Sequence, residues 1–190
     1  MHGQSWMATL LFAVIAFTGG YLAGLHGSPS PAQGASGAGG RSTACYFSPN
    51  GGCQEAVIDQ INAAQTSIEI QAYALTSPAV GEAILKAYRR GIHVAVVLDA
   101  AKNSENREVA AQLARAGVPI YFDTSHGVAD TRMILIDNQV IATGSFDLSD
   151  SAEQQNAENL VILRGNPQAQ AACESHFQQH LQHSTRFDGT

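Results

Sequence analysis

Residues 67–99 read SIEIQAYALTSPAVGEAILKAYRRGIHVAVVLD, and they predict a strand, a helix and a second strand in succession. SIEIQAYAL alternates apolar and polar side chains, which is the period of a β-strand. Ser77-Pro78 caps and opens the helix, and Gly91 ends it in the left-handed conformation that glycine favours. HVAVVLD is mostly apolar, as in a strand that is buried on both faces.

The segments on either side continue this alternation. ACYF at 44–47 predicts a short strand, and residues 53–65 have the apolar spacing of an amphipathic helix. Downstream, a helix is expected over 104–116, where Gly117 ends it, followed by the short strand IYF at 120–122. Such a series calls for a sheet that is covered by helices.

The second half of the chain has a different rhythm. MILID and QVIATGS predict a β-hairpin with its turn at Asp137-Asn138, and ENLVIL predicts a further strand. The polar segment between them, FDLSDSAEQQNA, is expected to be a loop or a short helix, and a terminal helix is expected from Pro167 to His183. Polar side chains at strand ends and in such loops are where an α/β sheet usually places its site.

The first 54 residues differ in composition from the rest. They carry one charge, Arg41, whereas all sixteen acidic residues lie from Glu55 onward. Residues 6–25 are 20 uncharged and mostly apolar residues, enough for a helix that crosses a bilayer. We therefore predict three parts: a signal peptide or transmembrane anchor at 1–26, a flexible Gly/Ser/Ala/Pro linker at 27–43, and a folded domain at 44–190.

An N-terminal segment of this kind delivers a domain outside the cytoplasm. We therefore expect a protein of a bacterial-type cell envelope, periplasmic or secreted, or anchored in the inner membrane. In an oxidising compartment, Cys45 and Cys53 can close the short loop between them as a disulfide. They can equally be reduced residues that pack in the interior, which is the role expected of Cys173.

The charge and cysteine content exclude some classes of function. The formal charge is −6, and the two lysines are Lys86 and Lys102. This balance argues against non-specific binding of nucleic acid or anionic lipid through a broad basic surface, although a local basic pocket is compatible with it. Three cysteines are too few for a four-cysteine zinc site.

Four segments together resemble one known family. They are YFSPNGGC, the stretch from IEIQAYAL to HVAVVLD, MILIDNQVIATGSF and NAENLVI. In this order and spacing they resemble the small Nuc-type endonucleases of the phospholipase D superfamily, over residues 45–187. The resemblance implies a single α/β domain with a mixed β-sheet flanked by helices on both faces. It also implies a homodimer that pairs two motif copies, and metal-independent hydrolysis of phosphodiesters in nucleic acid or phospholipid through a phosphohistidine, with no cofactor.

The chain keeps the frame of the family's HxKxxxxD and GSxN motif but changes its groups. In the family chemistry, one imidazole attacks phosphorus, another protonates the leaving oxygen, and Lys, Ser and Asn donate to the phosphate oxygens. The resemblance assigns six site positions: Asp130 in place of the nucleophilic His, Arg132 in place of Lys, the motif's Asp137 and Ser145, Asp147 in place of Asn, and the supporting acid Glu158.

These changes predict a catalytically impaired site. Arg132 can still grip a phosphate, although its reach differs from that of lysine. Asp130 and Asp147 each repel an approaching phosphodiester by about 1–4 kcal/mol. Residues 121–160 hold seven acidic residues against the single base Arg132, so the whole formal charge falls in the stretch expected to form the phosphate site. We expect a pocket that is poorly suited to an anionic substrate.

Three functions stay open. The chain is an active phosphodiesterase in which Asp130 is the nucleophile, a membrane-tethered non-catalytic relative that serves binding or assembly, or a divalent-cation site. The cation ligands would be Asp130, Asp147 and Glu158, with or without His126. The histidines have plainer explanations. We expect His126 to be a loop-packing or hydrogen-bonding residue. His176, His180 and His183 have a spacing that can ligate a metal, but we expect them to form a polar helix face.

Overall fold

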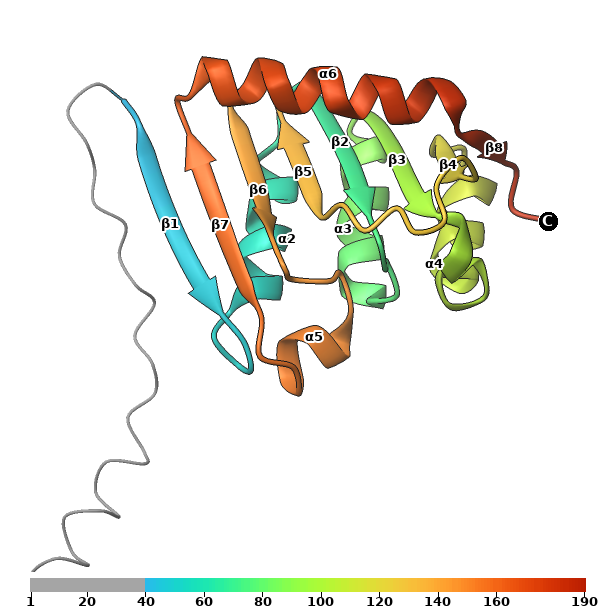
Figure 1. The fold of residues 1–190 in the computed structure, drawn as a ribbon, viewed down its shortest axis with the longest axis horizontal. Coiled ribbons are helices and arrows are strands. Elements are labelled where there is room, and N and C mark those ends of the chain that lie inside the picture. Colours follow the sequence, from blue (N-terminus) through green and yellow to red (C-terminus); the bar gives the residue numbers. More distant parts are fainter. Residues whose placement is uncertain (1–39) are drawn as a thin grey trace, which may run out of the picture. The chain divides into compact units, whose positions relative to one another are not determined.

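Within residues 40–190, the part of the chain that the computed structural model describes, eight strands form one mixed sheet (Figure 1). The strand order is β1-β7-β6-β5-β2-β3-β4-β8. The predicted signal peptide or anchor at 1–26 and residues 27–39 of the predicted linker lie outside the described residues. The last two residues of that linker belong to the sheet, because β1 spans Ser42–Phe47.

One half of the sheet is parallel, and helices connect its strands. Its strands are β2 (Ser67–Ala72), β3 (His93–Asp99) and β4 (Ile120–Asp123). The connections are α3 (Pro78–Arg89) and α4 (Asn103–Arg115), the latter preceded by a short 3₁₀ turn. The two helices are followed by glycines with positive φ, as expected: Gly91 at 89° and Gly117 at 94°.

The other half is antiparallel. β5 (Met133–Ile136) and β6 (Val140–Gly144) form the predicted hairpin, and β7 (Asn159–Arg164) pairs with both β6 and β1. Asp137 and Asn138 both have a φ of 54°, which is the left-handed conformation that a tight two-residue hairpin turn requires. The polar segment after β6 contains a short helix, α5 (Asp150–Gln154).

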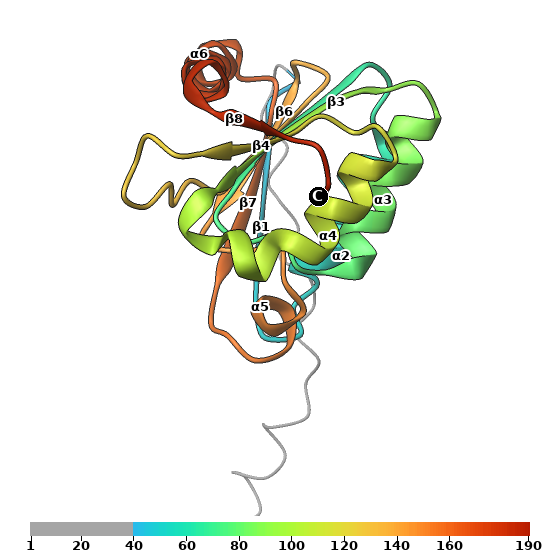
Figure 2. The ribbon, with the colours of Figure 1, turned by 90° about the vertical axis from the view of Figure 1, so that its right-hand side faces the viewer.

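Helices cover both faces of the sheet, as Figure 2 shows. α2 (Cys53–Ala63), α3 and α4 pack on one face, and α6 (Pro167–His183) crosses the other. The side chains of β3 divide between the two cores, because Val94, Val96 and Leu98 belong to the larger and Ala95 and Val97 to the smaller, beneath α6. This strand is buried on both faces, as its apolar run predicts.

Four details differ from the sequence-based expectations. The pattern did not predict β8 (Thr185–Phe187), which pairs with β4 at the edge of the sheet. β2 ends at Ala72 instead of continuing to Leu75, which makes only an isolated bridge to Leu148. The helix start at Ser77 was predicted correctly, but its hydroxyl is buried without a partner and does not cap α3. Cys45 and Cys53 do not form the disulfide: all three cysteines are free.

None of the helices in residues 40–190 has the length and apolar content to cross a membrane.

Candidate functional site

Five of the six family-equivalent positions gather at one edge of the sheet. This edge holds the end of β2, the start of β5, the end of β6 and the start of β7, because these strands run antiparallel to their neighbours. Asp130 and Arg132 precede β5, Ser145 and Asp147 follow β6, and Glu158 precedes β7. The carboxylates and the guanidinium therefore meet although up to 28 residues separate them.

Arg132 lies at the centre of this edge and is held by two carboxylates. Its Nη1 is 2.5 Å from Asp130 Oδ1, while Nε and Nη2 are 2.7 and 3.3 Å from the two oxygens of Asp147. Its guanidinium also lies over the ring of Tyr73, 5.2 Å from the centroid. Asp147 thus binds Arg132 in the two-pronged geometry that a phosphate would otherwise use.

The surroundings of Arg132 keep it charged. Burial by itself lowers the pKa of the guanidinium, but the hydrogen bonds and charge of Asp147, with the charges of Asp130 and Glu158, outweigh it and raise that pKa. A second cation is near, because Lys102 Nζ is 5.2 Å from the ring centroid of Tyr73. Lys102 is itself paired with Glu105 at 2.7 Å. Both cations next to Tyr73 are therefore neutralised by side chains of the chain itself.

Ser145 is fixed by the backbone of β7. Its N–H donates to the carbonyl of Asn159 at 3.0 Å, and its hydroxyl oxygen accepts from the N–H of Asn159 at 3.0 Å. The approach requires glycine at position 144, because a Cβ there would lie 2.2 Å from the carbonyl oxygen of Asn159. Glu158 accepts a hydrogen bond from the Asn156 amide at 2.9 Å. The backbone at Gly144 and Ser145 is therefore held against the start of β7.

A small cavity lies under Arg132 and Asp147. Its volume is about 10 Å³, and its walls include Gln71 and Thr143. This is no more than the space that one water molecule needs. The amide of Gln71 is 1% exposed and has no protein hydrogen-bond partner. In this arrangement the interior of the site does not admit a phosphodiester unless Arg132 moves away from its carboxylates.

Asp137, the sixth position, lies at the opposite end of β5 and has a structural role. Its carboxylate accepts hydrogen bonds from the backbone N–H groups of Gln65, Thr66 and Ser67 at 2.7–3.1 Å, and from the Thr66 hydroxyl at 2.9 Å. Burial raises the pKa of Asp137, but these hydrogen bonds outweigh it, so the pKa is lowered. Asp137 ties the hairpin to the turn before β2.

The acidic charge is less concentrated at the site than the sequence predicts. Of the seven acids in 121–160, Asp130, Asp147 and Glu158 are the ones that act on Arg132. Glu153 accepts hydrogen bonds from two N–H groups at the start of α2, at 2.9 and 2.8 Å. Asp137 likewise satisfies backbone donors of the turn before β2, and Asp123 pairs with histidines, so the sequence-based charge argument overstated the excess of acids around Arg132.

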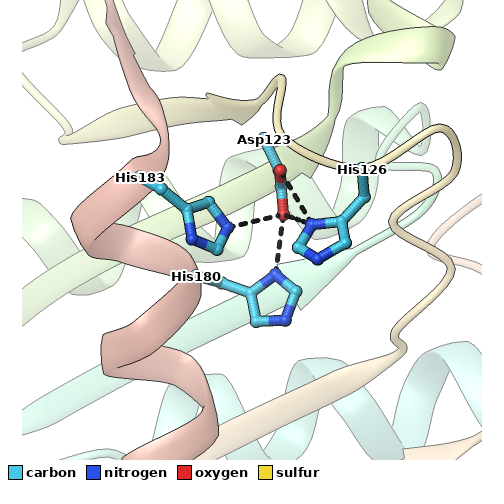
Figure 3. Close-up of side chains that lie close together, drawn as sticks. All are labelled: Asp123, His126, His180 and His183. Carbon is cyan, nitrogen blue, oxygen red and sulfur yellow. Dashed lines mark hydrogen bonds and ion pairs between the residues drawn. The ribbon is translucent and has the colours of Figure 1, made fainter.

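In the described residues, Asp130, Asp147 and Glu158 do not form a group of potential metal ligands. Arg132 occupies the space between the first two carboxylates. His126 does not join them either, because its ring faces Asp123 at 3.0 Å (Figure 3). The interpretation of His126 as a hydrogen-bonding residue is confirmed. In the described part of the chain, the one group of potential metal ligands consists of Asp123, His126, His180 and His183.

Sequence reasoning missed Gln71 and Tyr73 as neighbours of Arg132, and Lys102 as a neighbour of Tyr73. Gln71 and Tyr73 flank the end of β2, so their position at a strand end was the available signal. Lys102 lies on the turn after β3 and carried no such signal.

Comparison with known proteins places this geometry in a family. The family model described as cardiolipin synthase, PLD-like domain, matches residues 57–181. A phospholipase D of Rickettsia typhi is 28% identical over 147 residues, which cover 77% of this chain and 72% of that protein. A phospholipase D of Rickettsia conorii is 32% identical over 129 residues, 68% of this chain and 64% of the relative. A mitochondrial cardiolipin hydrolase of Mus musculus is 31% identical over 101 residues, which cover 53% of this chain and 46% of the relative.

Solved structures agree. The phospholipase D family member Nuc from Salmonella typhimurium superposes with a TM-score of 0.75 at 28% identity, covering 77% of this chain and 98% of Nuc. NucT from Helicobacter pylori has the same fold, with a TM-score of 0.68 at 20% identity, over 77% of this chain and 99% of NucT. The chain therefore belongs to the phospholipase D superfamily and has the fold of its Nuc-type members.

Proposed function

We propose that this chain is a catalytically impaired member of the phospholipase D superfamily that serves binding or assembly at a membrane instead of hydrolysis. One observation carries the proposal: Arg132 is held by Asp130 and Asp147, at the positions where the family has an imidazole and an amide. The nucleophile position thus offers a carboxylate that is already paired, and the cation that would bind the substrate is occupied.

A phosphodiester faces two costs at this site. To reach Arg132 it must displace Asp147, which holds the guanidinium through two hydrogen bonds. It must then stay beside Asp130 and Asp147, each of which repels an anion by about 1–4 kcal/mol at the effective dielectric of a protein surface. Two such penalties add up to a large loss of affinity before any chemistry begins.

The family resemblance extends the proposal to partners and location. We call the sheet edge that carries Asp130, Arg132, Ser145, Asp147 and Glu158 the motif edge, and we propose a homodimer that brings two motif edges together. We further propose nucleic acid or phospholipid as the ligand class, and a cell-envelope location through residues 1–26. The names of the relatives, phospholipase D and cardiolipin hydrolase, favour a phospholipid over a nucleic acid.

The second candidate is an active phosphodiesterase with a changed site. The side chain of Asp130 is 52% exposed, so its second oxygen is open to a substrate, and a carboxylate can act as a nucleophile. This candidate requires that Asp130 leaves Arg132 in the reactive state.

Hydrolysis assays separate the two candidates. The full chain is incubated with bis-p-nitrophenyl phosphate, plasmid DNA and phospholipid vesicles, in EDTA and with added Mg²⁺ or Ca²⁺. We expect no cleavage in EDTA, and recovered cleavage in the variant Asp130→His/Arg132→Lys/Asp147→Asn. Asp150→Asn is the matched control, because it removes an exposed acid outside the motif. Cleavage by the unmodified chain in EDTA would instead establish the active enzyme.

A further inference from the structure

A second cluster of titratable side chains lies at β4, which β2 and β3 separate from the strand that follows Arg132, and the proposed function does not use this cluster. We call it the histidine cluster; it consists of Asp123, His126, His180 and His183 (Figure 3). Asp123 is the last residue of β4, and His126 is in the loop that follows it. His180 and His183 lie in the last turns of α6, where residues three apart share one face.

The four side chains converge on one point. Asp123 Oδ2 is 2.6 Å from His180 Nδ1, 3.0 Å from His126 Nδ1 and 3.2 Å from His183 Nε2. The four candidate ligand atoms all lie within 4.8 Å of one another. The Asp123 carboxylate is fully buried and the His180 side chain is 12% exposed, whereas His126 and His183 reach the solvent. Asp123 and His180 therefore bury one side of this point, and the side at His126 and His183 is open to solvent, so an ion can enter there.

The arrangement is crowded for a hydrogen-bond cluster alone. Three imidazoles share one carboxylate oxygen, and their ring centroids are 4.8–5.2 Å apart. If all three were protonated, three positive charges would surround a single carboxylate. If they are neutral, they are three imidazole nitrogens beside a carboxylate, which is a donor set that binds transition metals.

We propose that the histidine cluster binds one divalent transition-metal ion, with Zn²⁺ as the preferred ion, through three imidazole nitrogens and the Asp123 carboxylate. Bonds of 2.0–2.1 Å in a tetrahedron separate neighbouring donor atoms by about 3.4 Å. The contacts of Asp123 Oδ2 with the three nitrogens therefore need to open by less than about 1 Å, and the widest donor pairs, which lie within 4.8 Å, need to close by at most about 1.4 Å. A nitrogen-rich set favours Zn²⁺ over Mg²⁺ and Ca²⁺, which prefer oxygen ligands.

The outer contacts support this assignment. The second oxygen of Asp123 accepts a hydrogen bond from the Ser125 N–H at 2.9 Å, which orients the carboxylate. His176 packs on His180 with ring centroids 4.3 Å apart. Ordered outer contacts of this kind hold metal ligands in place.

The site would connect two parts of the fold. His126 belongs to residues 124–132, the loop that also carries Asp130 and Arg132, while His180 and His183 belong to α6. A bound ion would fix that loop to the helix, and this role does not depend on whether the motif edge is active.

Titration of the metal-free full chain with Zn²⁺ alone tests the proposal. After EDTA treatment and buffer exchange, calorimetry is expected to show one Zn²⁺ per chain with a micromolar or lower Kd, and no comparable binding of Mg²⁺. His180→Gln and His183→Gln are each expected to weaken binding at least about tenfold. His93→Gln is the matched control, because His93 is an exposed histidine at the start of β3. Equal affinity in His93→Gln and His180→Gln, or no stoichiometric binding to the unmodified chain, would overturn the proposal.

Co²⁺ gives a readout that does not depend on how the variants fold. Tetrahedral Co²⁺ with nitrogen ligands absorbs visible light far more strongly than hexa-aqua Co²⁺. The unmodified chain is expected to develop this absorption at one Co²⁺ per chain and to lose it when Zn²⁺ is added. Weak octahedral-type absorption throughout the titration would contradict the site, and circular dichroism of each variant reports whether it is folded.

Discussion

The motif edge and the histidine cluster contain similar kinds of groups in opposite proportions. At the motif edge, Arg132 faces three carboxylates. In the histidine cluster, the single carboxylate of Asp123 faces three imidazoles. The loop 124–132 joins the two regions, and both lie near the same edge of the sheet. The carboxylates are in excess at the motif edge, so this region repels anions. The imidazoles are in excess in the histidine cluster, so that region offers nitrogen ligands to a metal cation.

The comparison also shows where imidazole chemistry is missing. The resemblance assigns the family's nucleophilic histidine to position 130, and this chain has Asp130 there, engaged with Arg132. The nearest histidine in the sequence, His126, lies four residues earlier and turns to Asp123. The imidazole of His126 is thus directed toward α6, and the carboxylate of Asp130, in the same loop, is directed toward the motif edge.

Removing Asp123 should have the largest effect. Asp123→Asn leaves three imidazoles around an uncharged amide in a fully buried position, and we expect a loss of about 2–4 kcal/mol in the free energy of unfolding. Urea denaturation of the metal-free chain measures it. Asp188→Asn, which changes an exposed carboxylate near the C-terminus, is the control and should change stability by less than about 0.5 kcal/mol. An equal effect of both substitutions would show that the histidine cluster contributes no stability.

Freeing Arg132 should make the motif edge resemble an anion site. The double variant Asp130→Asn/Asp147→Asn removes the two charges that hold the guanidinium. We expect affinity for dimethyl phosphate to rise at least about tenfold, since each removed charge is worth about 1 kcal/mol or more. Titration followed by NMR or calorimetry measures the change, and the same substitution at Asp150 and Asp188 is the charge-matched control. Unchanged affinity would mean that the two carboxylates do not block Arg132.

Asp137 provides a carboxylate of purely structural role for comparison. Asp137→Asn keeps the left-handed turn residue but loses charge-assisted acceptance from three N–H groups, so we expect a loss of about 1–2 kcal/mol at pH 7. The pKa of Asp137 is lowered in the folded state, so its contribution is present above the unfolded pKa and is lost as pH falls through the folded pKa. Unfolding at pH 7 and pH 3 should show a smaller stability difference between the two pH values in the variant than in the unmodified chain.

A pH-dependent effect of the opposite sign is expected at Glu69, beneath α6. Burial, followed by the hydrogen bond and charge of Glu174, raises the pKa of Glu69 from 4.5 to about 8. The folded state then binds more protons than the unfolded state between these values, so the contribution of Glu69 to stability falls as pH rises from 4.5 to 8. Glu69→Gln should be more stable than the unmodified chain at pH 8 and lose this advantage near pH 4. Glu82→Gln, on the exposed face of α3, is the control.

Local features of the fold could be predicted from the sequence. The hairpin turn at Asp137-Asn138, the helix end at Gly91 and the bounds of α6 each depend on a few consecutive residues, and all three are confirmed. β8 could not be predicted, because three residues carry no period and its pairing with β4 joins segments 65 residues apart. For the same reason, the side chains that pair with Asp123 and Asp147 could not be predicted, because those partners are distant in the sequence.

The candidate site was predictable as a set of positions but not as a set of contacts. The structure brings together Asp130, Arg132 and Asp147, three positions that the family frame named. The family frame could not show that Arg132 binds both carboxylates, since pairing depends on side-chain direction across β5 and β6. The ligand-like spacing of His180 and His183 was visible, but Asp123 lies 57 residues before His180 and gave no local signal.

Hydrolysis of bis-p-nitrophenyl phosphate in EDTA tests the central claim most directly. The unmodified full chain and the variant Asp130→His/Arg132→Lys/Asp147→Asn are compared at equal concentration. We expect that the unmodified chain does not exceed the rate in buffer and that the variant does. A rate for the unmodified chain that equals or exceeds that of the variant would contradict this expectation.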